Sequence, residues 1–223
     1  MTSRPTCQAV LFDLDGTLVD SAPDLGDAAN ELRQRHGLAP LDLSVFRPMT
    51  GTGARGMVAV ALDVGADDPR FKPLRDEYLA LYEARMTDRT RVFATMAPVL
   101  DALDAAGLPW GIVTNKFTRY AEPVVRACGI AERSRTLVCG DTTAHAKPHP
   151  EPLFEAARRL SVEPGACVYV GDDHRDILAG RAAGMSTLAA AWGYLGIGEQ
   201  INDWGADVVI DHPNGLLKFL AMT

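Results

Sequence analysis

The chain has 223 residues, a formal net charge of -7 and a sequence pI near 5.2. This length suits one large domain, or a core domain that carries an insertion. The negative charge argues against nucleic acid or an anionic membrane surface as the main partner, because both repel an acidic protein. No apolar run is long enough to span a bilayer or to act as a signal peptide, so we expect a cytoplasmic protein.

The cysteines and histidines show no pattern typical of a metal site. The four cysteines are scattered and none forms a CxxC pair, which argues against a zinc site and against a disulfide framework. The histidines also lack metal-ligand spacing, and we expect surface or loop positions for all five. They are His36, His145, His149, His174 and His212.

The first expected element is a buried strand over residues 9–12, which ends in Asp13 and Asp15. Alternation along a strand would place both carboxylates on the same side of the chain. Acidic groups at the tip of a buried strand cost free energy unless a cation, a proton or hydrogen bonds compensate. Gly16 allows a positive φ or the close approach of a ligand. The segment therefore predicts chemistry at a strand end, with an Asx-capped turn as the plain alternative.

An all-helical unit is expected next, over residues 21–92. No buried strand is evident there, and three helical segments take its place. They span residues 23–35, about 54–64, and 73–86. The unit would be inserted between the two parts of a core domain, residues 1–20 and 93–223.

A glycine-rich stretch at residues 50–56 opens the second of these helices and contains Arg55. Such a stretch suits a segment that reaches over a bound anion, with Arg55 contacting the substrate. The alternative is an ordinary loop between helices that carries a surface arginine.

The rest of the chain alternates short apolar runs with helical patterns. Strands are expected at residues 110–113, 136–139, 167–170, 186–190 and 207–210. Helices are expected between them, at residues 99–106, 119–127, 151–160 and 173–183. This alternation predicts an α/β fold with a doubly wound, mostly parallel sheet.

Polar residues follow three of the later strands, as they follow the first. They are Thr114, Lys147 and Asp172, the last with Asp173 and Asp176 nearby. The ends of parallel strands converge on one crevice in a doubly wound sheet. Carboxylate oxygens suit Mg²⁺, while a hydroxyl and a lysine suit phosphate. We therefore expect a phosphate-and-magnesium site.

Each of these residues also has a structural interpretation. Thr114 could cap the next helix, and Lys147 could be a solvated loop residue. Asp173 and Asp176 could cap a helix or favour its first turn. The four motifs together, in this order and at strand ends, are more specific than any one of them.

Four segments resemble the sequence motifs of the haloacid dehalogenase-like hydrolases. Residues 12–21 (FDLDGTLVDS) are similar to the first motif in the phosphoglycolate phosphatase branch. Residues 114–116, 147–148 and 171–176 resemble the second, third and fourth motifs. The resemblance covers nearly the whole chain, and the helical insertion falls where this branch has its small cap. It implies a Rossmann-like hydrolase core with an inserted helical cap.

The resemblance also implies catalytic and metal-binding roles. Asp13 would be the nucleophile that forms an aspartyl-phosphate, and Asp15 would be the general acid and base. Mg²⁺ would be held by Asp13, by the backbone carbonyl of Asp15 and by Asp172. Asp173 or Asp176 would act through water or from outside the ligand set.

Phosphate binding is implied for Thr114, Asn115 and Lys147, with Gly16 beside the ligand. Lys147 would also offset the repulsion between the phosphate and Asp13. Phosphoryl transfer depends mainly on positioning and charge neutralisation, which agrees with this set of residues.

The function expected from this resemblance is Mg²⁺-dependent hydrolysis of a small phosphorylated metabolite, most like phosphoglycolate phosphatase, by a monomer or homodimer. Residues 110–116, 121–123 and 202–209 also resemble the N-acetylmuramic acid 6-phosphate phosphatases of cell-wall recycling. A phosphosugar mutase is a more remote alternative. Asp15 argues against a dehalogenase, which needs no such acid, and the complete motifs argue against a binding protein without activity.

Overall fold

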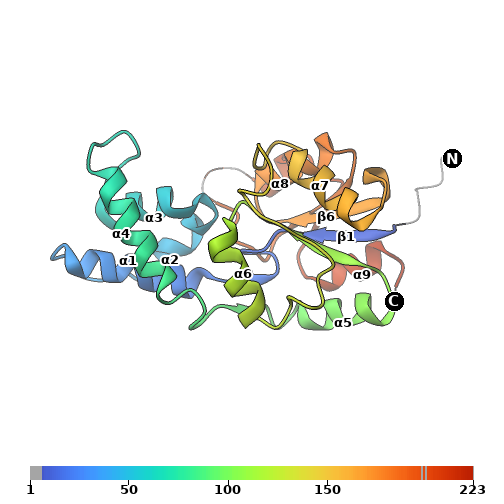
Figure 1. Ribbon diagram of the computed structural model, residues 1–223, viewed down its shortest axis with the longest axis horizontal. Coiled ribbons are helices and arrows are strands. Elements are labelled where there is room, and N and C mark those ends of the chain that lie inside the picture. The colour runs from blue at the N-terminus through green and yellow to red at the C-terminus, as the bar shows by residue number, and fades with distance from the viewer. Residues whose placement is uncertain (1–6, 197, 199, 223) are drawn as a thin grey trace.

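The structure, a computed structural model, describes residues 7–196, 198 and 200–222. Its centre is a six-stranded parallel sheet with the order β5-β4-β1-β6-β7-β8 (Figure 1). The strands are β1 (Ala9–Phe12), β4 (Trp110–Val113), β5 (Leu137–Val138), β6 (Cys167–Gly171), β7 (Ser186–Ala190) and β8 (Val208–Ile210). The expected doubly wound α/β fold is confirmed.

Helices cover both faces of the sheet. They are α5 (Ala97–Ala105), α6 (Thr118–Ala127), α7 (Glu151–Leu160), α8 (His174–Ala182) and α9 (Asn214–Phe219). Figure 1 shows α7 and α8 on one side of the sheet and α5 and α9 on the other. Side chains alternate in direction along β1, so successive residues of this strand pack on opposite faces of the sheet. Val10 and Phe12 pack in the core cluster that includes α5, α6 and α9, whereas Ala9 and Leu11 pack with α7 and α8.

Four helices are inserted between β1 and the rest of the core (Figure 1). They are α1 (Ala22–Arg35), α2 (Leu43–Phe46), α3 (Gly53–Leu62) and α4 (Phe71–Glu83). We refer to residues 21–92 as the cap, and we propose this division from the core as a working boundary. Buried residues of the cap share one continuous apolar cluster with one face of the sheet. No helix in the described part of the chain is long and apolar enough to cross a bilayer.

The two connections between core and cap run side by side. Strand β2 (Val19–Asp20) pairs antiparallel with β3 (Arg91–Val92), and Val19 faces Val92. The buried carboxylate of Asp24 supports this ribbon from α1. It accepts hydrogen bonds from the backbone N–H groups of Arg89 and Thr90 at 2.8–3.1 Å. The ribbon was not expected from the sequence, because two-residue strands have no detectable periodicity.

Short 3-10 helices complete the described elements. They are η1 (Arg47–Thr52), η2 (Pro164–Ala166) and η3 (Ile201–Asp203). The first of them runs directly into α3, and it contains the start of the glycine-rich stretch. This stretch therefore lies at the junction of two helical segments, as the sequence indicates.

Candidate active site

Three carboxylates gather at the ends of two adjacent strands. Asp13 follows β1, Asp172 follows β6, and Asp176 lies in the first turn of α8. Each offers one oxygen, and these atoms all lie within 4.8 Å of one another. Asp172 and Asp176 are buried. The pairing of β1 with β6 places the first two at the same edge of the sheet, which is where an open α/β sheet carries its site.

Lys147 provides the positive charge beside this cluster. Its Nζ lies 2.7 Å from an oxygen of Asp13 and 2.7 Å from an oxygen of Asp176. The same ammonium donates to the carbonyl oxygen of Val113 at 2.9 Å and contacts the Tyr169 hydroxyl at 2.8 Å. Its side chain is only 3% exposed, so the expected alternative of a solvated loop lysine is wrong. Burial alone would lower the pKa of the Lys147 ammonium. The nearby carboxylates of Asp13 and Asp176 outweigh this effect, so the Lys147 pKa is raised.

Burial raises the pKa of the carboxyl groups in this cluster. The pKa of Asp13 rises to about 7, although Lys147 pulls it down. Burial also raises the pKa of Asp172 well above its ordinary value, with the nearby charges of Asp13 and Asp176 adding to the effect. One ammonium thus faces three acidic groups. A divalent cation would supply the missing positive charge, and an all-oxygen donor set suits Mg²⁺.

Two neighbouring groups orient the Asp172 carboxylate. The Thr17 hydroxyl donates to Oδ1 at 2.8 Å, and the Tyr194 backbone N–H donates to Oδ2 at 2.7 Å. Gly16, with φ of 88°, lies against the same carboxylate, and a Cβ there would come within 2.2 Å of Oδ2. A side chain at position 16 would displace the carboxylate, which explains why glycine follows Asp15.

Asp15 faces a different partner from Asp13. The Lys116 ammonium lies 2.9 and 3.0 Å from its two oxygens, and the Ser21 hydroxyl donates to Oδ1 at 2.5 Å. Lys116 also lies 4.9 Å above the ring of Tyr82, a residue of cap helix α4. Burial opposes the charge of Lys116, yet Asp15 raises its pKa. The pair therefore stands where core and cap meet.

The second motif supports the site from β4. Thr114 is buried and its hydroxyl accepts from the Lys116 backbone N–H at 3.1 Å. Helix α6 begins at Thr118, so the interpretation of Thr114 as its cap is wrong. The Asn115 amide bonds the backbone N–H and carbonyl of Lys147, both at 2.9 Å. Asn115 thus fixes the lysine segment, while its binding of phosphate stays a prediction.

Asp173 caps helix α8, and Asp176 completes the cap from the first turn of that helix. Asp173 accepts from the Arg175 backbone N–H at 2.8 Å, and its own N–H donates to Asp176 at 3.1 Å. This reciprocal arrangement is a capping box. The Asp173 carboxylate also pairs with the Arg175 guanidinium at 2.8 Å. Of the two acids, only Asp176 joins the cluster around Lys147.

The glycine-rich stretch of the cap reaches this part of the core. The Arg175 guanidinium donates to the Gly51 carbonyl at 2.5 Å. Arg55, by contrast, is exposed on α3, and within the described part of the chain it forms no ion pair with the site. Contact of Arg55 with substrate therefore stays a prediction.

Several site residues were not identified from the sequence. They are Lys116, Tyr82, Tyr169, Tyr194 and Arg175. Lys116 belongs to the recognised second motif, but nothing in that motif pairs it with a residue 101 positions away. The tyrosines are single aromatic residues in apolar surroundings, where packing is the ordinary interpretation.

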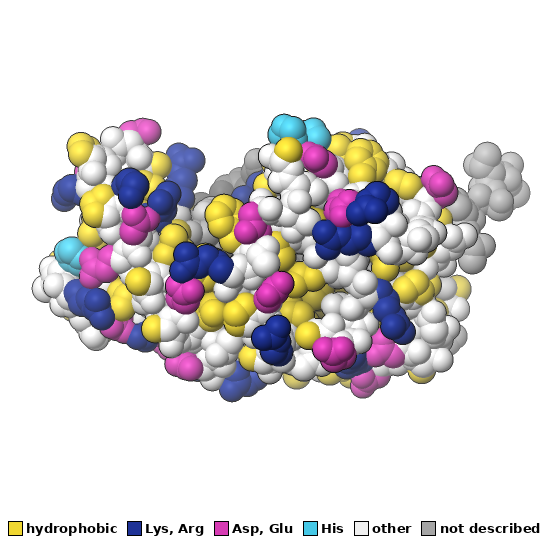
Figure 2. Space-filling model, in the orientation of Figure 1, with side chains coloured by type: hydrophobic (Ala, Val, Ile, Leu, Met, Phe, Trp, Pro, Cys, Tyr) yellow, Lys and Arg dark blue, Asp and Glu magenta, His cyan; other side chains and the backbone are white. Residues whose placement is uncertain are grey.

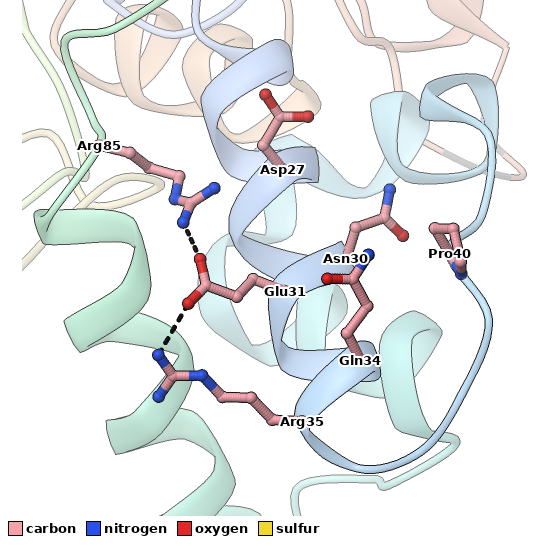
Figure 3. Close-up of a pocket in the computed structure, with 7 residues that line it drawn as sticks. All are labelled: Asp27, Asn30, Glu31, Gln34, Arg35, Pro40 and Arg85. Carbon is pink, nitrogen blue, oxygen red and sulfur yellow. Dashed lines mark hydrogen bonds and ion pairs between the residues drawn. The ribbon is translucent and has the colours of Figure 1, made fainter.

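A separate cavity of about 670 Å³ opens on the cap (Figure 3). It is lined by Asp27, Asn30, Glu31, Gln34, Arg35, Pro40 and Arg85. Glu31 extends between two arginines there, pairing with Arg35 at 2.7 Å and with Arg85 (Figure 3). None of the predicted site residues lines this cavity, so it is distinct from the carboxylate cluster.

Comparisons with known proteins agree with the geometry. The model of the haloacid dehalogenase-like hydrolase family matches residues 7–184. An N-acetylmuramic acid 6-phosphate phosphatase of Pseudomonas aeruginosa is 44% identical, over 97% of this chain and 96% of its own. A phosphoglycolate phosphatase of Xanthomonas campestris is 45% identical, over 92% and 93%. A crystal structure of a predicted phosphoglycolate phosphatase from Haemophilus somnus superposes with a TM-score of 0.84 at 27% identity, covering 96% and 98% of the two chains.

The family match spans most of the chain, and the relatives align along nearly all of it. Their shared description is that of phosphatases, and the strand-end carboxylates and buried lysine form a site suited to phosphate chemistry. The chain is therefore a phosphatase that belongs to the haloacid dehalogenase-like hydrolase family.

Proposed function

We propose that this chain hydrolyses a phosphate monoester with Asp13 as the nucleophile. The observation that carries the proposal is the position of Asp13, 2.7 Å from the buried Lys147 ammonium and within 4.8 Å of oxygens of Asp172 and Asp176. An acid in that position has a charged partner that can also attract a phosphate group. No packing role explains three acids and a lysine at one strand edge.

The first chemical step transfers the phosphoryl group to the protein. An Asp13 oxygen attacks phosphorus, the bond to the ester oxygen breaks, and Asp15 donates a proton to the departing alkoxide. In the second step Asp15 takes a proton from water, which attacks phosphorus and releases phosphate and the free Asp13 carboxylate. Lys116 and Ser21 hold the Asp15 carboxylate in place for both transfers.

Lys147 keeps the phosphate and the Asp13 carboxylate close together despite their like charges. Asn115 holds the backbone of Lys147, and the hydroxyl of Tyr169 contacts its ammonium. The Lys147 ammonium is therefore in position before the reaction begins. Less free energy is then needed to reorganise charged groups in the transition state.

Mg²⁺ fits the donor set of Asp13, the Asp15 backbone carbonyl and Asp172. When bound, it would neutralise charge on the phosphate oxygens and orient the phosphorus for attack. Asp176 lies in the same cluster but already pairs with Lys147 and caps α8, so we place it beside the metal ligands rather than among them.

We propose 2-phosphoglycolate as the first candidate substrate, on the strength of the relatives at 45% identity with that name. N-acetylmuramic acid 6-phosphate is the second candidate, because a relative with that name aligns over 97% of this chain. Both compounds are phosphate monoesters that also carry a carboxylate. The cap side of the site offers Lys116 and, beside its ammonium, the buried Tyr82.

The test is a comparison of kcat/KM for the two esters in the presence of Mg²⁺, with the Asp13→Asn protein as control. A preference of at least about tenfold, or about 1.4 kcal/mol in transition-state binding, would identify the substrate class. Slow hydrolysis of both esters, with a stable phosphorylated Asp13, would favour the phosphosugar mutase alternative. Equal turnover by the wild-type and Asp13→Asn proteins would rule out the proposed mechanism.

A further inference from the structure

Three metal-ligating side chains gather outside the active site, at the start of α7. They are His145, His149 and Glu151. Each offers one ligand atom, and these atoms all lie within 4.8 Å of one another. His145 and His149 lie exposed in the loop before α7, as expected for surface or loop residues. Their spacing resembles no standard motif, because it is the turn into α7 that brings them together.

The contacts within this group are close. His145 Nδ1 lies 2.7 Å from Glu151 Oε2, and His149 Nδ1 lies 3.9 Å from the same oxygen. The two imidazole rings stack with their centroids 4.4 Å apart. His149 Nδ1 accepts a hydrogen bond from the Glu151 backbone N–H at 3.2 Å, and an ion bound at this nitrogen would replace that hydrogen bond. Two nitrogen donors thus flank one carboxylate.

The group is accessible from solvent. The side chains of His145 and His149 are 62% and 50% exposed, and that of Glu151 is 38% exposed. Figure 2 shows histidine side chains gathered at the upper edge of the molecule, in the region of α7 and α8. An ion could therefore reach the group directly from solution and keep water in its open coordination positions.

The backbone that carries the histidines is fixed by the core. Lys147 lies between them and is buried among Asp13, Asp176, Val113 and Tyr169. The Asn115 amide holds the backbone of Lys147 on both sides. This segment is therefore already ordered before an ion binds. Binding then costs little conformational entropy, which favours a higher affinity.

We propose that His145, His149 and Glu151 form a surface site for a divalent transition ion of the Zn²⁺ or Ni²⁺ class. Two imidazoles and one carboxylate are a donor set that such ions prefer, whereas Mg²⁺ prefers oxygen ligands alone. The chain then holds two cation sites of different chemistry, an all-oxygen cluster in the crevice and a nitrogen-rich group on the surface. Because Lys147 lies between the two histidines, the second ion binds on the segment that carries the active-site ammonium.

The test is titration of the untagged full chain with Zn²⁺ against a chromophoric chelator, in excess Mg²⁺ to occupy the oxygen cluster. The variants are His145→Gln and Glu151→Gln, which keep polar side chains at exposed positions. His36→Gln is the matched control. His36 Nε2 lies 3.0 Å from Glu77 Oε2, but this exposed pair belongs to no group of three ligands within the described residues.

We expect one Zn²⁺ site in the wild-type protein, weakened by at least about tenfold in His145→Gln and Glu151→Gln and unchanged in His36→Gln. Asp13→Asn retains the site, which separates it from the oxygen cluster. Unchanged Zn²⁺ affinity in both His145→Gln and Glu151→Gln, or loss of binding in Asp13→Asn, would overturn the proposal. The readout is binding alone, so it does not depend on the proposed phosphatase mechanism.

Discussion

The Lys116 ammonium is bonded to both carboxylate oxygens of Asp15, a residue 101 positions earlier in the chain. This pair joins the loop after β4 to the loop after β1. The same ammonium lies over the Tyr82 ring of the cap, so one side chain contacts both the proposed acid/base and the helix that covers it. Lys116 therefore orients the Asp15 carboxylate without itself taking part in the proposed proton or phosphoryl transfers.

Replacing Lys116 by Gln should lower kcat by about 10²-fold, the contribution typical of a well-placed general acid or base. The reason is that Asp15 loses its orienting partner. Lys116→Arg keeps the charge and should recover part of the activity, and it also controls for the loss of a buried ion pair. Lys72→Gln, at an exposed lysine of the cap, is the matched surface control. Steady-state kinetics with either candidate substrate measure the effect, and an unchanged kcat would remove Lys116 from its positioning role.

Replacing Asp13 by Asn should lower kcat by at least about 10³-fold, because the amide cannot attack phosphorus. The fold should persist, since the amide has nearly the same shape and can accept a hydrogen bond from Lys147. Circular dichroism and phosphate release measure the two outcomes. Substantial activity in this variant would show that Asp13 is not the nucleophile.

Removal of divalent metal with EDTA should abolish activity, and added Mg²⁺ should restore it. Asp172→Asn should raise the Mg²⁺ concentration needed for half-maximal activity, because it removes one of the proposed ligands. Asp173→Asn should affect this concentration less, since Asp173 caps α8 and pairs with Arg175. Equal shifts in the two variants would contradict the proposed ligand set.

The stabilisation by Mg²⁺ should increase with pH. Burial raises the Asp13 pKa to about 7 in the folded chain, against an unfolded value of about 3.9. Between these values the folded state binds more protons than the unfolded state, so the free energy of unfolding of the metal-free protein falls as pH rises. Mg²⁺ binds the ionised form and offsets that loss. We expect a larger Mg²⁺-dependent rise in Tm at pH 7.5 than at pH 5.5, and a weaker pH dependence of that rise in Asp13→Asn.

Replacing Arg55 by Ala should raise KM more than it lowers kcat, if the glycine-rich stretch brings this residue to a substrate anion. Arg55 is exposed at the start of α3, close in sequence to Gly51, whose carbonyl contacts Arg175. Arg126→Ala, at an exposed arginine near the end of α6, is the control. No change in either constant would remove Arg55 from the substrate site.

The elements of the core could be predicted because each carries a local signal. The apolar run before Asp13 and the two prolines before Glu151 indicate a strand and a helix directly. The predicted helix at residues 151–160 coincides with α7, and the predicted strand at residues 186–190 coincides with β7. Helix α2, with four residues, is too short for its periodicity to be recognised.

The partners within the site could not be predicted in the same way. The bonds of Asn115 with Lys147 and of Asp15 with Lys116 join segments far apart in the sequence. They depend on the order of the strands in the sheet, which single-sequence patterns do not contain. The motif resemblance identified Lys116 as part of the second motif without giving it a partner.

The antiparallel ribbon of β2 and β3 has a consequence for how this protein can be altered. Since Val19 pairs with Val92, the points where the chain leaves and re-enters the core are one strand spacing apart, about 5 Å. A segment with its ends so close can be exchanged for another of different length or shape without stretching the sheet. A segment grafted from a relative onto this ribbon would therefore have to supply its own counterparts of Ser21 and Tyr82, which contact Asp15 and Lys116.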